Sequence, residues 1–104
     1  MAGDAYFEVT TPLGRHVRVT AAYWDVIVTL KHPIMQGKEE LVQQALQIPI
    51  EIRQSRSDPS VYLHYEVEPP YLTYVVVRYL NGDGFIITAY RTSKIKEGTV
   101  VWTP

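Results

Sequence analysis

The alternation of apolar and polar residues changes period near residue 50. From there on, IEIRQ (50–54), VYLHYEV (61–67), YLTYVVVRYL (71–80) and FIITAYR (85–91) alternate as strands with one buried face do. SRSDPS, EPP and NGDG separate them and are turn sequences. The pattern predicts a four-stranded antiparallel meander, and TVVW (99–102) is a candidate for a last short strand.

Before residue 50 the pattern is mixed. YFEVT (6–10) and RHVRVT (15–20) alternate around the turn TPLG, which predicts a hairpin. Residues 21–31 fit a helix capped by Thr20, although their β-branched and aromatic content also suits a third strand. GKEELVQQALQIP (37–49) predicts a second helix, with acids in its first turn and an apolar stripe of Leu41, Val42, Ala45 and Leu46.

These elements predict an α+β fold. An N-terminal hairpin or strand and two helices precede a four-stranded antiparallel β-meander, and the helices pack on one face of the sheet. With 104 residues, the chain has a common size for one domain, so we expect a single α+β domain over 1–104.

Tight turns also predict which side chains share a face. A turn at Gly82 and Asp83 pairs Leu80 with Phe85 and Val77 with Thr88, and a turn at Pro69 and Pro70 pairs Tyr62 with Val77. The predicted core face carries Ile50, Ile52, Leu63, Tyr65, Val67, Leu72, Val76, Leu80, Phe85, Ile87 and Ala89. The other face then carries one row of Arg53, Tyr62, Val77 and Thr88, and a second row of Glu51, His64, Val75 and Tyr90.

Charge and composition restrict the classes of function. The net charge of −1 argues against tight sequence-independent binding to nucleic acid, which favours a basic excess. The sequence holds no cysteine, no apolar run of the roughly 20 residues that a membrane span needs, and no recognisable secretory signal. Three widely spaced histidines do not suggest a metal site. We therefore expect a cytoplasmic protein with no cofactor, metal or membrane contact.

The polar face suggests acid–base chemistry on RNA. The ribose 2′-hydroxyl is an internal nucleophile, so an enzyme has only to move protons and stabilise charge on the phosphate. Arginine binds phosphate through two parallel hydrogen bonds, and tyrosine stacks on unpaired bases. The predicted catalytic residues are His32, Arg53, Thr88 and Tyr90, and the predicted substrate-binding residues are Ser55, Arg56, Tyr62 and His64. His32 is the expected proton donor or phosphate contact, and the general base is either His64 or Tyr90.

Each candidate also has a structural explanation. Tyrosine and threonine are favoured on any strand surface, and arginine is common beside loops such as 55–60. His32 ends the first predicted helix, where a histidine interacts favourably with the helix dipole.

Two stretches together resemble a known superfamily. KHPIMQGKEELVQQALQIPIEIRQSRSDPSVYLHY and VVVRYLNGDGFIITAY are similar to the small phage- and bacterium-borne domains of the barnase–EndoU–colicin–RelE-like ribonuclease folds. The resemblance implies N-terminal helices, a four-stranded antiparallel sheet and metal-independent RNA cleavage. It matches His32 to the helix histidine, and it matches Arg53, Ser55 and Arg56 to the basic segment before the sheet. Thr88 and Tyr90 match the hydroxyl-bearing strand.

Two functions follow as hypotheses. The first is a small metal-independent endoribonuclease, toxin-like or phage-derived. The second is a non-catalytic protein-interaction domain, as a homodimer or with a partner such as an antitoxin. Eight tyrosines and two tryptophans favour the second, since aromatic side chains anchor protein interfaces, and the TVVW edge offers a strand for pairing.

Overall fold

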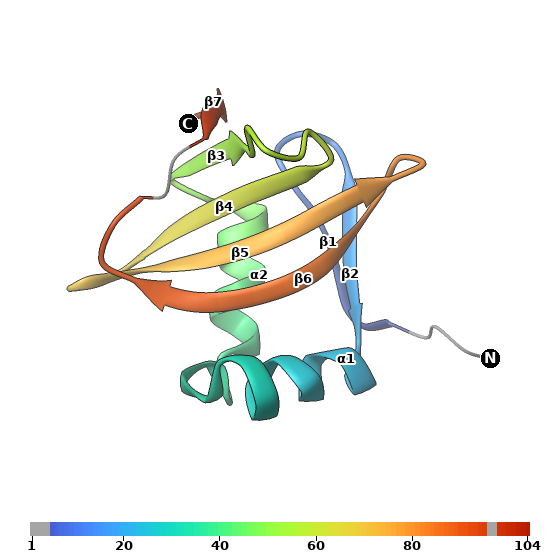
Figure 1. Ribbon diagram of the computed structural model, residues 1–104, viewed down its shortest axis with the longest axis vertical. Helices are drawn as coiled ribbons and strands as arrows, with labels where there is room; N and C mark the ends of the chain where they lie inside the picture. Colours follow the sequence, from blue (N-terminus) through green and yellow to red (C-terminus); the bar gives the residue numbers. More distant parts are fainter. Residues whose placement is uncertain (1–4, 96–97) are drawn as a thin grey trace.

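A single sheet organises the protein (Figure 1). The computed structural model describes residues 5–95 and 98–104. Within them the strand order is β1-β2-β6-β5-β4-β3-β7. The neighbouring strands are antiparallel except for β2 and β6, whose short parallel pairing joins Val17 to Gly84 and Arg18 to Phe85. The strands are β1 (Ala5–Thr10), β2 (His16–Thr20), β3 (Glu51–Gln54), β4 (Val61–Glu68), β5 (Tyr71–Leu80), β6 (Asp83–Thr92) and β7 (Thr99–Trp102).

The helical residues lie between β2 and β3. Helix α1 (Ala21–Val26) starts after Thr20, whose hydroxyl accepts a hydrogen bond from the Tyr23 amide at 3.1 Å. This bond confirms the predicted cap. A π-helical turn, η1 (Ile27–Lys31), and a 3₁₀ turn, η2 (Pro33–Met35), continue the chain. Helix α2 (Glu39–Gln47) has the two predicted acids in its first turn and buries Val42, Ala45 and Leu46 of the predicted stripe, whereas Leu41 is only partly buried. None of the described helices is long and apolar enough to cross a membrane.

The predicted fold class is wrong, although its hairpin, helices and strands are all present. The expected four-stranded meander is only the middle of a seven-stranded mixed sheet, and the helices are short. The β1–β2 hairpin extends one side through the parallel pairing of β2 with β6, and β7 extends the other side beyond β3. Local periodicity carries no information about either pairing, because each joins segments that are far apart in the sequence.

One face of the sheet, here called the inner face, packs against the helices. It carries Tyr62, His64, Val75, Val77, Ile86 and Ala89. The sheet curves so that α2 lies behind β4–β6 and also meets β1 (Figure 1). The main core joins these strand residues to Trp24, Ile27 and Val28 of α1 and η1, and to Val42, Ala45 and Leu46 of α2.

The opposite face, here called the outer face, has its own buried cluster. Leu63, Tyr65 and Tyr74 are its most buried members, and Val76 and Tyr90 pack beside them. All described members of this cluster belong to strands β4–β6 except Ile50, which directly precedes β3. The core face predicted from the sequence is therefore largely inverted, because Leu63, Tyr65 and Val76 lie on the face away from α2.

A hairpin turn explains part of the inversion. Asn81 and Gly82 have φ angles of 53° and 88°, the left-handed conformation that a type I′ turn requires. The two-residue turn is thus one residue earlier than predicted, and Leu80 pairs with Asp83. A bulge then leaves Ile87 without a partner on β5, so Thr88 faces Val76 and Tyr90 faces Tyr74. Beyond the bulge the shift is one residue, which leaves Thr88 and Tyr90 on the outer face and separates them from Val77 and Tyr62 on the inner face.

The loop before β4 explains the rest. The Ser55 amide donates to the Val61 carbonyl at 2.9 Å, which extends the pairing by one residue. Asp58 holds the loop by accepting from both the amide and the hydroxyl of Ser60. Arg53 therefore pairs with Leu63 and not with Tyr62. A shift of one residue exchanges the two faces, so Arg53 also lies on the outer face.

Candidate functional site

The imidazole of His32 stacks on the ring of Tyr90. The ring centroids are 4.7 Å apart and the planes differ by 27°. His32 follows η1, and Tyr90 lies near the end of β6 on the outer face. Both side chains are partly exposed, so solvent and a ligand can reach them. Two proton-exchanging groups predicted from the sequence are therefore in direct contact.

The end of the first helix is tied to β6 by two polar side chains. The Tyr23 hydroxyl donates to the Ile87 carbonyl at 2.7 Å, and the Lys31 ammonium donates to the same carbonyl at 3.2 Å and to the Tyr23 hydroxyl at 2.8 Å. Ile87 is the bulged residue, and its carbonyl accepts both of these hydrogen bonds. The wide turn of η1 follows directly on α1, and the His32 amide closes it by donating to the Ile27 carbonyl at 2.7 Å. This segment holds Lys31 and His32 beside β6.

Tyr90 belongs to a row of aromatic side chains on the outer face. The Tyr90 and Tyr74 ring centroids are 4.6 Å apart, and those of Tyr74 and Tyr65 are 5.0 Å apart. Tyr65 is fully buried and Tyr74 is 6% exposed. The row therefore supports Tyr90 from below and leaves the His32 end accessible.

The surroundings shift the proton affinities of the pair in opposite directions. Burial, and then the charge of Lys31, lower the pKa of His32. Burial raises the pKa of Tyr90, and a hydrogen bond from Tyr74 opposes part of that shift. At neutral pH the imidazole is thus neutral and can accept a proton, while the phenol is protonated and can donate one. Such a divergence is the arrangement that separates a general base from a general acid.

Thr88 lies two residues before Tyr90 on the same face. Its hydroxyl oxygen is buried and has no hydrogen-bond partner among the described residues. Buried hydroxyls in proteins nearly always have a partner, so this oxygen is an exception. The structure thus brings Thr88 near the His32–Tyr90 pair, and its hydroxyl has no hydrogen-bond partner among the described residues.

Two predicted binding residues lie on the wrong face. Tyr62 and His64 are on the inner face, and His64 is fully buried with its Nε2 atom 3.4 Å from the Tyr79 hydroxyl. Burial lowers the pKa of His64 to about 4, although nearby backbone of Val75 and Tyr62 opposes the shift. The register shifts described above are the cause. The expected cleft joining Tyr62 and His64 to Thr88 and Tyr90 is therefore not formed, and His64 is inaccessible as a base.

The basic residues predicted for phosphate binding lie at the other side of the sheet. Arg53 pairs with Glu51 and also reaches the Gly98 carbonyl at 3.4 Å. Three strand spacings, about 14 Å, separate its position from that of Thr88. Ser55 bonds within its own loop, to Ser57 and Asp58, and Arg56 is exposed there. None of the three accompanies the His32–Tyr90 pair.

Sequence reasoning missed Lys31, Tyr23 and Tyr74. Lys31 and Tyr23 are eight residues apart, a helical spacing that places them on the same side, and this signal was available. Tyr74 faces Tyr90 only in the correct register, so predicting this contact requires locating the Asn81–Gly82 turn and the bulge.

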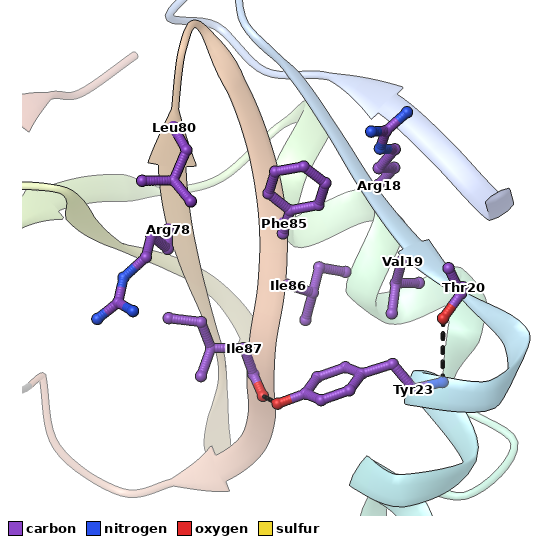
Figure 2. A pocket seen from close by; sticks show the side chains of 9 residues that line it. All are labelled: Arg18, Val19, Thr20, Tyr23, Arg78, Leu80, Phe85, Ile86 and Ile87. Atoms are coloured by element: carbon purple, nitrogen blue, oxygen red, sulfur yellow. Dashed lines mark hydrogen bonds between the residues drawn. The ribbon is translucent and has the colours of Figure 1, made fainter. Parts of the chain in front are cut away.

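A pocket of about 370 Å³ opens where β2 and β6 diverge (Figure 2). Its apolar lining is Val19, Leu80, Ile86 and Ile87, and the rings of Tyr23 and Phe85 lie at its two ends. The guanidinium groups of Arg18 and Arg78 flank it on opposite sides. The two strands pair only through Val17–Gly84 and Arg18–Phe85, and a Cβ atom on Gly84 would lie 2.9 Å from the Val17 side chain of β2. Sequence analysis did not anticipate this pocket.

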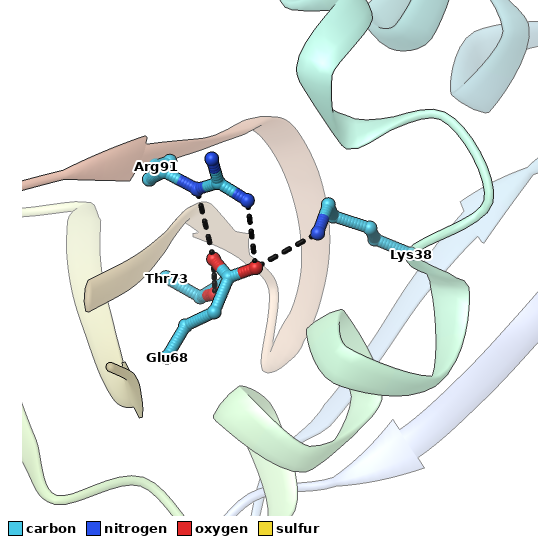
Figure 3. A network of polar contacts seen from close by, with 4 residues as sticks. All are labelled: Lys38, Glu68, Thr73 and Arg91. Atoms are coloured by element: carbon cyan, nitrogen blue, oxygen red, sulfur yellow. Dashed lines mark hydrogen bonds and ion pairs between the residues drawn. The ribbon is translucent and has the colours of Figure 1, made fainter. Parts of the chain in front are cut away.

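A polar network lies near the other end of β6 (Figure 3). The Glu68 carboxylate accepts from Lys38 at 2.8 Å, from Arg91 at 3.0 and 3.3 Å, and from the Thr73 hydroxyl at 3.2 Å. The hydrogen bond from Arg91 is the main cause that lowers the pKa of Glu68 to about 2. The network links the start of α2 to β4, β5 and β6, and its groups are all partnered, which suits a structural role.

No group of three or more His, Cys, Asp or Glu side chains in the described ranges is arranged to hold a metal ion. Comparisons of the chain with protein-family models, with curated proteins and with solved structures found no match. The resemblance to the barnase–EndoU–colicin–RelE-like superfamily therefore stays a prediction.

Proposed function

We propose that the protein is a small metal-independent endoribonuclease whose reaction takes place at the His32–Tyr90 pair. The observation that carries the proposal is the contact between a neutral imidazole and a protonated phenol at an accessible position, with the Lys31 ammonium close by. Fold alone would not support it, because one scaffold hosts many functions.

The chemistry assigns one role to each group. His32 accepts the proton of a ribose 2′-hydroxyl, and the oxygen attacks the adjacent phosphorus. Tyr90 donates its proton to the departing 5′-oxygen, and Lys31 stabilises the negative charge on the phosphate. The products are a 2′,3′-cyclic phosphate and a 5′-hydroxyl. Compared with the sequence-based hypothesis, His32 becomes the base, and the distant Arg53 has no place in the step.

A cleavage assay tests the proposal. Purified protein incubated with end-labelled RNA in EDTA is expected to produce cyclic-phosphate ends. His32→Ala and Tyr90→Phe should each reduce the rate by about 100-fold or more, the range typical of acid–base groups. The matched control is His16→Ala, which removes an exposed histidine whose ring contacts only the Thr10 hydroxyl among its described hydrogen bonds. Equal cleavage by all four proteins would reject the site and expose a contaminating nuclease.

A protein-interaction domain is the second candidate, because one edge of the sheet is open and apolar. β7 pairs with β3, no strand lies on its other side in the described chain, and Val100 and Val101 are 46% and 39% exposed. Such an edge can pair with a second copy or with a partner such as an antitoxin. Light scattering should then detect a dimer that Val101→Lys converts to a monomer. A monomer at all concentrations would count against self-pairing.

The proposed location is the cytoplasm, where a chain without cysteine needs no oxidising environment to fold. Fractionation of the source cells with an antibody against the protein tests it.

A further inference from the structure

We infer that the pocket between β2 and β6 receives an unpaired base of single-stranded RNA, next to the reaction centre. This inference rests on the proposed function, and it names the form of RNA and the surface that selects it. The pocket has the usual character of a ligand site, since it is concave and apolar with a few charged groups at its margin.

The lining suits a base with a flanking phosphate. Aliphatic and aromatic side chains cover the faces of a planar ring, and proteins that bind single strands hold bases against aromatic rings and arginine. Arg18 lies over Phe85, with its Cζ atom 4.9 Å from the ring centroid. The Phe85 ring holds Arg18 in this position. Glu8 is opposite Arg18 in the β1–β2 register, but no ion pair joins Arg18 to Glu8 or to any other acid in the described chain. Its charge is therefore available to a phosphate.

Arg78 supplies the second charge. It forms an ion pair with Asp58 at 2.9 Å, but both side chains are more than 40% exposed. Exposed pairs of this kind contribute little stability, so Arg78 can exchange Asp58 for a phosphate oxygen at small cost. Because of these two arginines, the margin of the pocket is positive although the chain as a whole has a net charge of −1.

The pocket and the proposed reaction centre are physically joined. Tyr23 lines the pocket and bonds to Ile87 and Lys31. From Ile87 to Tyr90 is three residues of β6, about 10 Å. A stacked single strand advances about 3.4 Å per nucleotide, so a strand along β6 would place a base in the pocket within about three nucleotides of the cleaved bond.

Binding to an RNA that cannot be cleaved isolates the pocket from the chemistry. Fluorescein-labelled 2′-O-methyl oligoribonucleotides lack the nucleophile, and anisotropy measures their affinity. Phe85→Ala and Arg18→Ala should each weaken binding of a single strand by roughly tenfold or more. The control is Arg15→Ala, which removes the same charge from the same hairpin but lies over Tyr79 on the other side of the sheet. An oligonucleotide with one abasic position should lose affinity for the wild type and not for Phe85→Ala.

The outcomes separate the inference from the proposed function. Equal binding by wild type, Arg15→Ala and both pocket variants would overturn the inference, even if the protein cleaves RNA. Equal affinity for duplex RNA would overturn it too, since a paired base cannot enter the pocket. Loss of single-strand binding in the pocket variants, in a protein that cleaves no RNA, would support the pocket and refute the catalytic proposal. Thermal melts of each variant distinguish lost binding from lost folding.

Discussion

The imidazole of His32 covers the ring of Tyr90 at a centroid distance of 4.7 Å, and this contact joins the helical segment to the outer face of the sheet. The two residues are far apart in the sequence, and the contact depends on the tie between Lys31, Tyr23 and the Ile87 carbonyl. The same tie places a positive charge near the imidazole, which is one reason why the pKa of His32 is lowered. Position and proton affinity thus have a common structural origin.

This origin predicts a particular dependence of cleavage on pH. A neutral His32 is needed as base, so the rate should fall as the pH drops below a midpoint lying under 6.5. Lys31→Gln removes the charge and should move that midpoint upward, toward 6.5, in addition to lowering the rate. Lys38→Gln, which removes an equal charge from the start of α2, should leave the midpoint unchanged. If Lys31→Gln leaves the midpoint of the fall in cleavage rate at low pH unchanged, the assignment of His32 as base is contradicted.

The Glu68 network gives a prediction about stability. Glu68→Gln removes the charge that Lys38 and Arg91 share, so the free energy of unfolding at pH 7 should drop by roughly 1–3 kcal/mol. Because the pKa of Glu68 falls from 4.5 to about 2 on folding, its contribution is complete above pH 4.5 and is lost as the pH falls toward 2. The gap between variant and wild type should therefore close across this range. Urea unfolding at several pH values measures it.

Glu66→Gln is the matched control for this prediction. It makes the same substitution two residues earlier in β4, where the carboxylate accepts the Val67 amide at 2.7 Å. The control should cost clearly less stability. If both variants lose the same amount, the network contributes nothing beyond a surface charge.

The strands and helices could be predicted from the sequence because each depends on local chemistry. Alternation marks β4 and β5, and the turn at Pro69 and Pro70 gave their register correctly. The predicted β5–β6 register is wrong because Asn81 supplies a second left-handed residue and Ile87 is bulged. Neither feature disturbs the alternation of apolar and polar residues enough to reveal it in the sequence. The joining of β2 to β6 and of β7 to β3 depends on packing between distant segments.

In the candidate site, too, local features could be predicted and contacts that depend on strand register could not. His32, Thr88 and Tyr90 could be selected by residue type and by resemblance, and the structure does bring them to one region. Tyr62 and His64 were assigned to that region through a one-residue error in register, which places a side chain on the opposite face. The pocket beside Arg18 could not be anticipated, since it exists only where two non-consecutive strands separate.

The buried His64 makes the fold sensitive to mild acid. Its pKa falls from 6.5 to about 4 on folding, so the unfolded chain binds the proton first. The contribution of His64 to the free energy of unfolding should be constant above pH 6.5 and decrease by roughly 3 kcal/mol between pH 6.5 and 4, from about 1.4 kcal/mol per pH unit. His64→Leu should abolish most of that decrease. His32 titrates in both proteins, so the difference between them isolates His64, and parallel curves for the two would refute the cause.

Thr88 offers a test that distinguishes stability from function at one atom. Its buried hydroxyl has no partner among the described residues, so Thr88→Val, which keeps the shape, should leave the free energy of unfolding unchanged or raise it by about 1 kcal/mol. Thr88→Ser keeps the hydroxyl and loses a methyl group, and should lower that free energy by about 1 kcal/mol. If the hydroxyl serves the reaction at the His32–Tyr90 pair, cleavage should follow the opposite order, with Thr88→Ser active and Thr88→Val slow. Parallel changes in stability and cleavage would instead assign Thr88 to packing alone.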